Sequence, residues 1–149
     1  MVWAAFSRAG KLELQFVSSK MNSADYITTL EKSLTPFLSH FEDEDWTFQQ
    51  DNARIHTSRK TMAWFRDEKI TVLDWPACSP DLNPMENLWA IMVRRVYAEN
   101  KQYDTVDQLR VAIGSAWLDV EPKILQNLIE SMKRRLFQLI GRAGRLTDY

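Results

Sequence analysis

The chain has 149 residues, a formal net charge of −1 and 45% hydrophobic residues, totals that predict one globular domain with a substantial core. The near balance of charge gives no global sign of nucleic-acid binding, although charge can be concentrated locally. The single cysteine, Cys78, excludes an internal disulfide and a cysteine-rich zinc site. No apolar run approaches the roughly 18 residues of a membrane-spanning helix, so we expect no membrane partner.

The first quarter of the chain predicts a hairpin followed by a helix. Residues 1–7 (MVWAAFS) and 11–18 (KLELQFVS) have the pattern of two short strands, with Gly10 in the turn between them. Residues 22–41 then place apolar side chains at helical spacing. Pro36 is expected to bend or end this helix, because proline removes a backbone donor.

The next part of the chain alternates strand and helix. Residues 46–50 (WTFQQ) predict a buried strand that ends at Asp51. Residues 58–69 carry apolar side chains among charges and predict a surface helix, whereas the β-branched run 70–75 (ITVLDW) predicts another strand. Strands interleaved with helices are typical of an α/β layer rather than an all-β fold.

From Pro84 onward the apolar pattern is helical. It predicts three helices, over residues 83–100, 105–120 and 121–141. We find no internal repeat, low-complexity tract or linker in the sequence. The sequence therefore predicts a single domain with a helical C-terminal third.

Two carboxylates follow strands in this plan. Asp51 stands at the expected end of a strand, where ligands collect in open α/β sheets, and Glu86 stands in the first turn of the helix after the next strand. Two anions about 4 Å apart would repel by about 4 kcal/mol at an effective dielectric constant of about 20. A cation between them removes that repulsion, and Mg²⁺ prefers oxygen ligands of this kind. The pair therefore fits metal-assisted phosphodiester chemistry.

The spacing alone favours structural roles for the same residues. Asn83 as N-cap, Pro84 at the first helical position and Glu86 in the first turn match a capping box, which is the commoner role for such spacing. A lone aspartate after a strand is more often a turn former than a ligand. His56 is interpreted as a hydrogen-bonding residue rather than a zinc ligand, because its only companion histidine, His40, lies at an apolar helix end.

Two sequence blocks are distinctive. They are WTFQQDNARIHTS, which contains Asp51, and ITVLDWPACSPDLNPMENLW, which contains Glu86, and 34 residues separate the two acids. Both blocks and their spacing resemble the catalytic domain of mariner-type (Tc/mariner superfamily) transposases of the Asp-Asp-Glu branch. The opening MVWAAFS also resembles a strand of that family, and the resemblance covers essentially the whole chain.

The resemblance implies a ribonuclease-H-like fold, in which helices flank a mixed sheet and three acids hold two Mg²⁺ or Mn²⁺ ions. It implies hydrolysis at transposon ends and then attack of a 3′-hydroxyl on target DNA. By carry-over, Asp51 is the second catalytic, metal-binding acid and Glu86 is the third. Four further residues match motif positions and are expected near the metal or the DNA, with a structural role held equally open: Asn52, His56, Asn83 and Asn87.

The resemblance also places a first acid on a central strand that comes before the one resembling residues 1–7. None of the early acids Glu13, Asp25 and Glu31 occupies an equivalent place. We therefore expect residues 1–149 to be an N-terminally truncated catalytic domain, either a fragment of a longer coding region or a truncated relic. We expect this chain alone to have little or no strand-transfer activity, because one ligand is absent from its residues.

Double-stranded DNA, as transposon ends and as target, is the partner that the resemblance implies, and a nuclear location follows from the same analogy. The alternative is a non-catalytic, domesticated or decayed module that binds DNA or forms a homodimer. Phosphate contacts by basic side chains would be steeply salt-dependent. The expected DNA-contacting residues are Arg54, Arg59, Lys60, Arg94 and Arg95, together with Lys133, Arg134 and Arg135, and a plain solvated role is equally open for Arg94 and Arg95.

Overall fold

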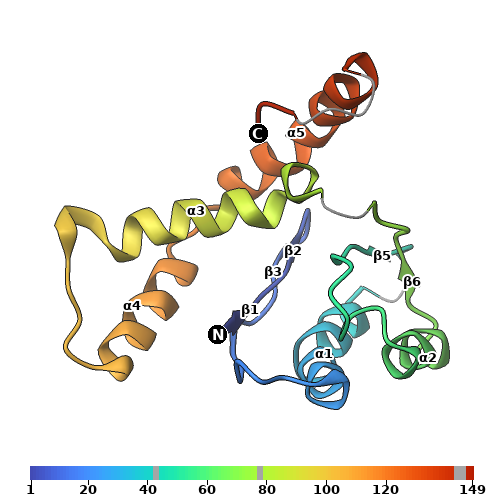
Figure 1. Cartoon of the computed structure of the whole chain (residues 1–149), viewed down its shortest axis with the longest axis horizontal. Coiled ribbons are helices and arrows are strands. Elements are labelled where there is room, and N and C mark those ends of the chain that lie inside the picture. Colours follow the sequence, from blue (N-terminus) through green and yellow to red (C-terminus); the bar gives the residue numbers. More distant parts are fainter. Residues whose placement is uncertain (42–43, 77–78, 143–146) are drawn as a thin grey trace. The chain divides into compact units, whose positions relative to one another are not determined.

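The computed structural model divides the chain into two compact units, whose elements are labelled in Figure 1. Unit 1 contains Met1–Ala4 and Leu12–Cys78, and unit 2 contains Ala5–Lys11 and Ser79–Tyr149. The structure describes residues 1–41, 44–76, 79–142 and 147–149, so Cys78 lies outside the described residues. Within these ranges every strand is two residues long, and helices provide most of the regular structure in both units.

The strands of unit 1 form two separate pairs. β1 (Val2–Trp3) is antiparallel to β4 (Gln15–Phe16), and β5 (Thr47–Phe48) is parallel to β6 (Thr71–Val72). The strand predicted within residues 46–50 is present as β5, but its predicted burial and its end at Asp51 are wrong, because β5 ends at Phe48 and Thr47 is exposed. Among the described residues β5 pairs with β6 alone, so no second neighbour extends its ladder.

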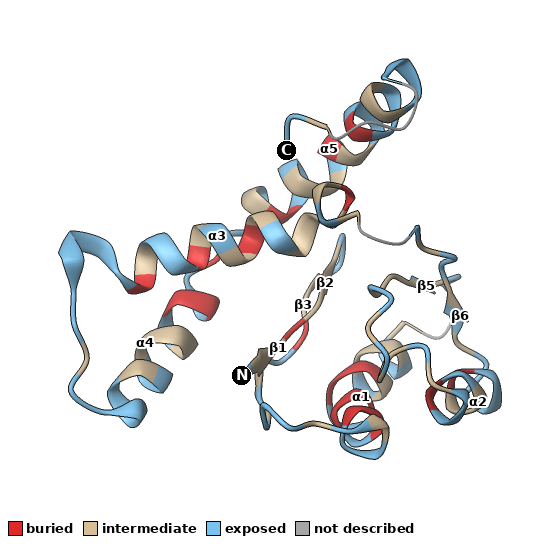
Figure 2. Cartoon of the chain, in the orientation of Figure 1, coloured by how far each residue is buried: buried red, intermediate tan, exposed pale blue. Residues whose placement is uncertain are grey.

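Two helices cover much of unit 1. α1 (Ser23–Ser39) begins at a capping box formed by Asn22, and α2 (Arg59–Asp67) begins at the N-cap Ser58. α1 continues three residues past Pro36, so the proline does not end the helix. The two helices contact each other, and buried positions recur along both in Figure 2. Burial of the apolar side chains at these positions stabilises the packing of α1 against α2.

Unit 2 begins with the turn of the predicted hairpin. β2 (Phe6–Ser7) is antiparallel to β3 (Gly10–Lys11), and Gly10 has a φ of 140°, a conformation that glycine adopts without steric cost. The antiparallel pairing predicted for the first 18 residues is confirmed, although its strands are divided between the two units. The remaining elements are η1 (Pro80–Leu82), α3 (Pro84–Val96), η2 (Ala98–Asn100), α4 (Val106–Leu118) and α5 (Pro122–Gly141).

The three C-terminal helices of the sequence prediction are confirmed, with one boundary corrected. The helix predicted over 83–100 ends at Val96, where the next residue Tyr97 leaves the helical conformation, and the positive φ angles of Glu99 and Asn100 prevent its continuation to residue 100. Thr105 caps α4 as its side chain accepts a hydrogen bond from the backbone N–H of Gln108. Among the described helices, none has the length and apolar character needed to cross a bilayer.

The core of unit 2 lies where α3 meets α4 and α5. Leu88 and Met92 of α3 are buried, and the ring of Trp89 stacks on that of Trp117 of α4 at 6.3 Å. Lys11 closes the end of α4, because its Nζ donates to the backbone oxygens of residues 117, 118 and 120. A cation at a helix C-terminus satisfies carbonyls that have no partner within the helix.

Candidate metal-binding acids and their surroundings

Asp51 lies in unit 1, three residues after β5, in a loop that its own side chain helps to shape. Its Oδ1 accepts hydrogen bonds from the backbone N–H of Ala53 at 3.0 Å and from Nδ1 of His56 at 2.6 Å. The Asp51 side chain is 58% exposed, whereas that of His56 is only 18% exposed. Two hydrogen bonds to Oδ1 therefore orient the carboxylate, and more than half of the side chain remains open to solvent.

The buried Tyr26 and the half-buried Gln50 support His56. The ring of Tyr26 lies 4.2 Å from the His56 ring, and its hydroxyl donates to Oε1 of Gln50 at 2.8 Å. Nε2 of Gln50 then donates to the backbone oxygen of His56 at 3.2 Å. Burial raises the pKa of Tyr26, so the hydroxyl stays protonated and keeps its role as donor. Sequence analysis assigned no role to either residue: Tyr26 lies outside the two distinctive blocks, and Gln50 lies within the first of them, directly before Asp51.

Asn52 ties the Asp51 loop to the neighbouring strand segment. Its Nδ2 donates to the backbone oxygen of Trp75 at 2.7 Å, a residue just beyond β6. This contact gives Asn52 a structural role, because it joins the loop after β5 to the segment after β6. Its side chain is also exposed, so the expected role near metal or DNA stays a prediction.

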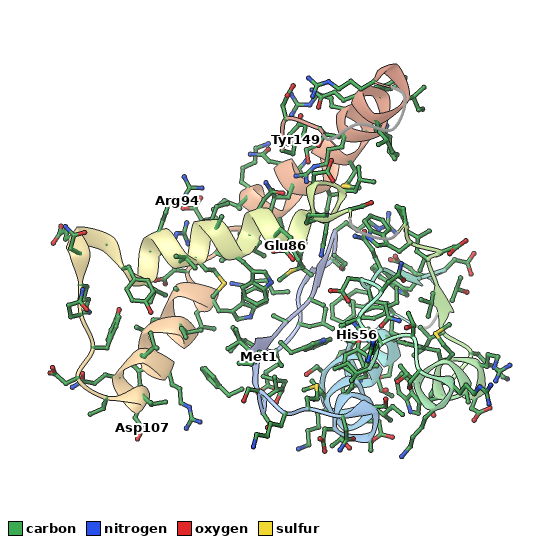
Figure 3. The ribbon with its side chains drawn as sticks, in the orientation of Figure 1. Met1, His56, Glu86, Arg94, Asp107 and Tyr149 are labelled. Atoms are coloured by element: carbon green, nitrogen blue, oxygen red, sulfur yellow. The ribbon has the colours of Figure 1, made fainter. Side chains whose placement is uncertain are left out.

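Glu86 lies in unit 2, in the first turn of α3, and it is labelled in Figure 3. Asn83 is the N-cap, with Oδ1 accepting from the backbone N–H of Met85 at 3.1 Å, and Pro84 is the first helical residue. The full capping box is not formed, because the backbone N–H of Asn83 donates to the oxygen of Pro80 instead of to Glu86. Glu86 is exposed and its carboxylate has no hydrogen-bond partner among the described residues.

Both acids fit a divalent cation by their chemistry. Each offers carboxylate oxygen to solvent, and hydrogen bonding of a liganding carboxylate by a second residue, as His56 does for Asp51, is usual at metal sites. Asp51 belongs to unit 1 and Glu86 to unit 2. Among the described residues there is no group of three or more His, Cys, Asp or Glu side chains arranged to hold a metal.

The basic residues predicted to contact DNA divide between the units. In unit 1, Arg54, Arg59 and Lys60 are exposed, and the last two lie in the first turn of α2. The N-terminus of a helix carries a partial positive charge and favours anions. Arg59, Lys60 and the N-terminus of α2 would therefore all attract a phosphate group. The three residues thus place positive charge close in sequence to Asp51.

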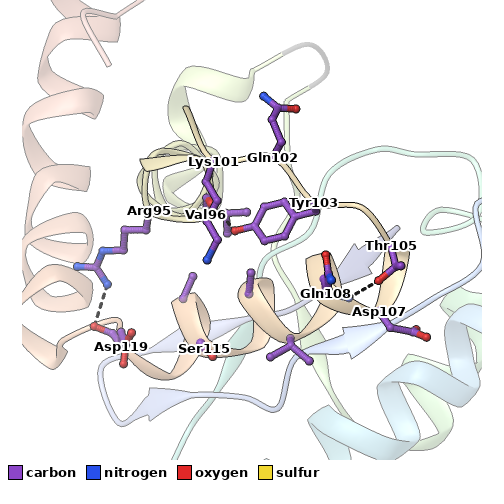
Figure 4. A pocket seen from close by; sticks show the side chains of 13 residues that line it. Arg95, Val96, Lys101, Gln102, Tyr103, Thr105, Asp107, Gln108, Ser115 and Asp119 are labelled. Atoms are coloured by element: carbon purple, nitrogen blue, oxygen red, sulfur yellow. Dashed lines mark hydrogen bonds between the residues drawn. The ribbon is translucent and has the colours of Figure 1, made fainter. Parts of the chain in front are cut away.

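In unit 2, Arg94 and Arg95 lie near the end of α3. Arg94 is exposed, and its Nε donates to the backbone oxygen of Ala90 at 3.2 Å. Arg95 lines a pocket of about 850 Å³ between α3 and α4, where its Nη1 donates to the backbone oxygen of Asp119 at 2.8 Å (Figure 4). This bond joins the two helices, so Arg95 has a structural role and its DNA contact stays a prediction.

One residue of the expected basic surface is not on the surface. Lys133 and Arg134 are exposed on α5, but Arg135 is fully buried. The expectation that Arg135 contacts DNA is therefore wrong. Helical periodicity turns position 135 toward the same side as the buried Ser131, one turn earlier. Asn87, the remaining motif residue, is half-buried on α3, and its expected role stays a prediction.

Solved structures define the fold class of the chain. The Mos1 transposase catalytic domain solved with Raltegravir and Mn has a TM-score of 0.88 and 20% identity, over 99% of this chain and 76% of that chain. The Mos1 mariner paired-end complex with Mn has a TM-score of 0.87 and 20% identity, over 99% of this chain and 44% of that chain. The predicted ribonuclease-H-like α/β fold with a helical C-terminal region is thereby confirmed.

Sequence comparison then identifies the family. Residues 1–110 match the family described as DDE superfamily endonuclease, and this range includes both Asp51 and Glu86. The chain belongs to that superfamily, which confirms the resemblance on which the site residues were chosen.

Similar curated proteins are transposases of nematodes. The chain is 52% identical over 149 residues to the Tc3 transposase of Caenorhabditis elegans, covering 100% of this chain and 45% of that protein. It is 32% identical over 149 residues to the Tc1 transposase of the same species, covering 100% of this chain and 54% of that protein. The chain thus spans about half the length of these relatives.

Proposed function

We propose that this chain is the catalytic domain of a DNA transposase, which cleaves DNA at transposon ends and transfers the new 3′ end to target DNA. The observation that carries the proposal is that Asp51 and Glu86 both lie within the residues matching the DDE superfamily. Similarity to the Tc3 and Tc1 transposases supports the same reaction. The expectation that residues 1–149 alone have little strand-transfer activity stays a prediction.

Asp51 and Glu86 are proposed as two of the acids that hold Mg²⁺ or Mn²⁺. The Mos1 catalytic domain has been solved with each of these metals, which supports the choice. A pair of such ions, when bound, stabilises the attacking and leaving oxygens of a phosphodiester displacement. In this chain His56 and the Ala53 amide hold Oδ1 of Asp51, and the exposed carboxylate would be available to a cation. Glu86 presents its carboxylate from the first turn of α3.

The proposed partner is double-stranded DNA, at transposon ends and at the target. Arg54, Arg59 and Lys60 are the residues best placed to contact phosphate near Asp51, because they are exposed and close to it in sequence. The Mos1 paired-end complexes support a homodimer as the working state. We also propose a nuclear location, on the analogy of the family alone.

A titration with Mn²⁺, followed by thermal unfolding, tests the metal role. A cation that binds only the folded chain stabilises it by about 2.7 kcal/mol at a concentration of about 100 times Kd. We expect Asp51→Asn and Glu86→Gln to remove most of this stabilisation. Asp67→Asn and Glu99→Gln are matched controls, because both residues are exposed carboxylates outside the site. Equal stabilisation of all five proteins by Mn²⁺ contradicts the proposal.

A DNA-binding assay at several salt concentrations separates this proposal from a non-catalytic module. We expect Arg59→Gln and Lys60→Gln each to reduce the slope of log affinity against log salt by about 1, and Lys123→Gln on α5 to leave it unchanged. A decayed or domesticated module would retain the DNA affinity but show no stabilisation by Mn²⁺. Unchanged slopes in both unit 1 variants contradict the proposed DNA contacts.

A further inference from the structure

Arg135 is a buried cation that the proposed reaction does not use directly. It lies on α5, beyond residues 1–110 that match the family, and its relative exposure is 0%. Its Nε donates to Oγ of Ser131 at 3.0 Å, and its Nη1 donates to the backbone oxygen of Asp81 at 2.6 Å. A buried guanidinium loses its hydration, and the two hydrogen bonds of Arg135 offset part of that cost while they fix its position.

The contact of Arg135 is to η1, the turn that leads into α3. Asp81 is the middle residue of η1, and its own carboxylate Oδ2 accepts from the backbone N–H of Thr147 at 2.8 Å. The ring of Tyr149 lies 4.4 Å from the Arg135 guanidinium carbon, a cation–π contact, and Figure 3 places Tyr149 beside α5. Helix α5 therefore holds the backbone of Asp81, and the C-terminal residue Thr147 holds its side chain.

The turn η1 leads into the first turn of α3, which carries Glu86. η1 ends at Leu82, which is buried, and the next residue is Asn83, the N-cap of α3. The backbone N–H of Asn83 donates to the oxygen of Pro80, and the backbone N–H of Glu86 donates to the oxygen of Asn83. A shift of η1 is thus passed through two successive hydrogen bonds to the turn that carries the acid.

We propose that Arg135 is a positioning residue for the metal-binding acid Glu86, acting through its bond to the backbone of Asp81. This inference rests on the proposed function, because it assigns to Arg135 the placement of one proposed ligand. The Glu86 carboxylate has no hydrogen-bond partner among the described residues, so its position depends on the backbone beneath it. Arg135 fixes that backbone from outside α3.

Hydrogen exchange and Mn²⁺ binding, measured by NMR on the whole 149-residue chain, test this role. Arg135→Lys keeps the charge but loses the planar fork, and Tyr149→Leu removes only the cation–π partner. We expect Arg135→Lys to speed exchange of the Met85 and Glu86 amides at least about tenfold and to weaken Mn²⁺ broadening at Glu86 about tenfold. Lys123→Gln, which removes an exposed cation from the same helix, should change neither.

The outcomes separate the two proposals. Faster exchange in the first turn of α3 together with weaker Mn²⁺ broadening supports the positioning role. Faster exchange with unchanged Mn²⁺ broadening overturns it, since Arg135 would then serve stability alone. If Arg135→Lys does not fold, Tyr149→Leu is the second variant: loss of the cation–π contact loosens the guanidinium and with it the bond to the Asp81 oxygen, so the same two signals should move in the same direction to a smaller extent, and two unchanged signals would overturn the role. If the native chain shows no Mn²⁺ effect at either acid, the proposed function fails, and unchanged exchange would overturn the role of Arg135 as well.

Discussion

The two acids are held in different ways by the two units. In unit 1, side chains orient the carboxylate of Asp51 itself, through His56 and the Tyr26–Gln50 chain behind it. In unit 2, Glu86 has no such partner among the described residues, and only its backbone is fixed, by the cap Asn83 and the turn before it. The carboxylate of Asp51 is therefore held directly by hydrogen bonds, whereas that of Glu86 is positioned only through its backbone.

The largest expected effect comes from removing the buried cation of unit 2. Arg135→Met leaves the backbone oxygen of Asp81 without its charged donor and removes the bond to Ser131. Hydrogen bonds that involve a charged group contribute about 1.5–3 kcal/mol each, so we expect a loss of about 3 kcal/mol in the free energy of unfolding. Urea unfolding measures the loss, and a change below about 0.5 kcal/mol would contradict the account of η1.

The next effect tests the side-chain support of unit 1. His56→Ala removes the donor to Oδ1 of Asp51, and loss of such an outer partner typically lowers metal affinity 10–100-fold, so we expect a decrease of about tenfold. A Mn²⁺ titration measures it. His40→Ala removes the other histidine, which is exposed at the end of α1, and should leave the affinity unchanged. Equal effects of the two variants would show that His56 does not orient Asp51 for the metal.

A smaller effect is expected at the backbone support of Glu86. Asn83→Ala removes the side-chain acceptor of the Met85 amide, and loss of an N-cap costs about 1 kcal/mol. Thr105→Ala removes the N-cap of α4 at a similar cost and is the matched control. Thermal unfolding should register both variants, but only Asn83→Ala should also weaken Mn²⁺ binding. Weakening by both variants would show that general stability, not the position of Glu86, sets the affinity.

The smallest expected effect is on the stability at low pH, through Asp81 of unit 2. The hydrogen bond from the Thr147 backbone lowers the pKa of Asp81, against a smaller opposing effect of burial. A carboxyl whose pKa is lower in the folded state contributes stability above its unfolded pKa, near pH 4, and loses that stability as the pH falls further. Unfolding measured between pH 5 and about pH 2 should show a shallower acid loss in Asp81→Asn than in the native chain. Parallel pH profiles of the two proteins would refute this assignment.

Local signals in the sequence predicted much of this molecule correctly. Thr105 and Asn83 were recognisable as helix starts, and the structure confirms both as N-caps. Capping depends on residues within one turn, so short-range patterns are enough to find it. Strand lengths were predicted poorly, because β5 depends on a partner strand 24 residues away for its ladder.

Residue types at fixed spacing were enough to predict the family and the order of helices and strands, and they singled out Asp51 and Glu86 as the candidate acids. Only the tertiary structure decided that Tyr26 and Gln50 support His56, and that Arg135 lies under the turn before α3 instead of on the surface. Arg135 and Asp81 are 54 positions apart along the chain. Contacts at such separation arise from packing, and nothing in the neighbourhood of either residue in the sequence signals them.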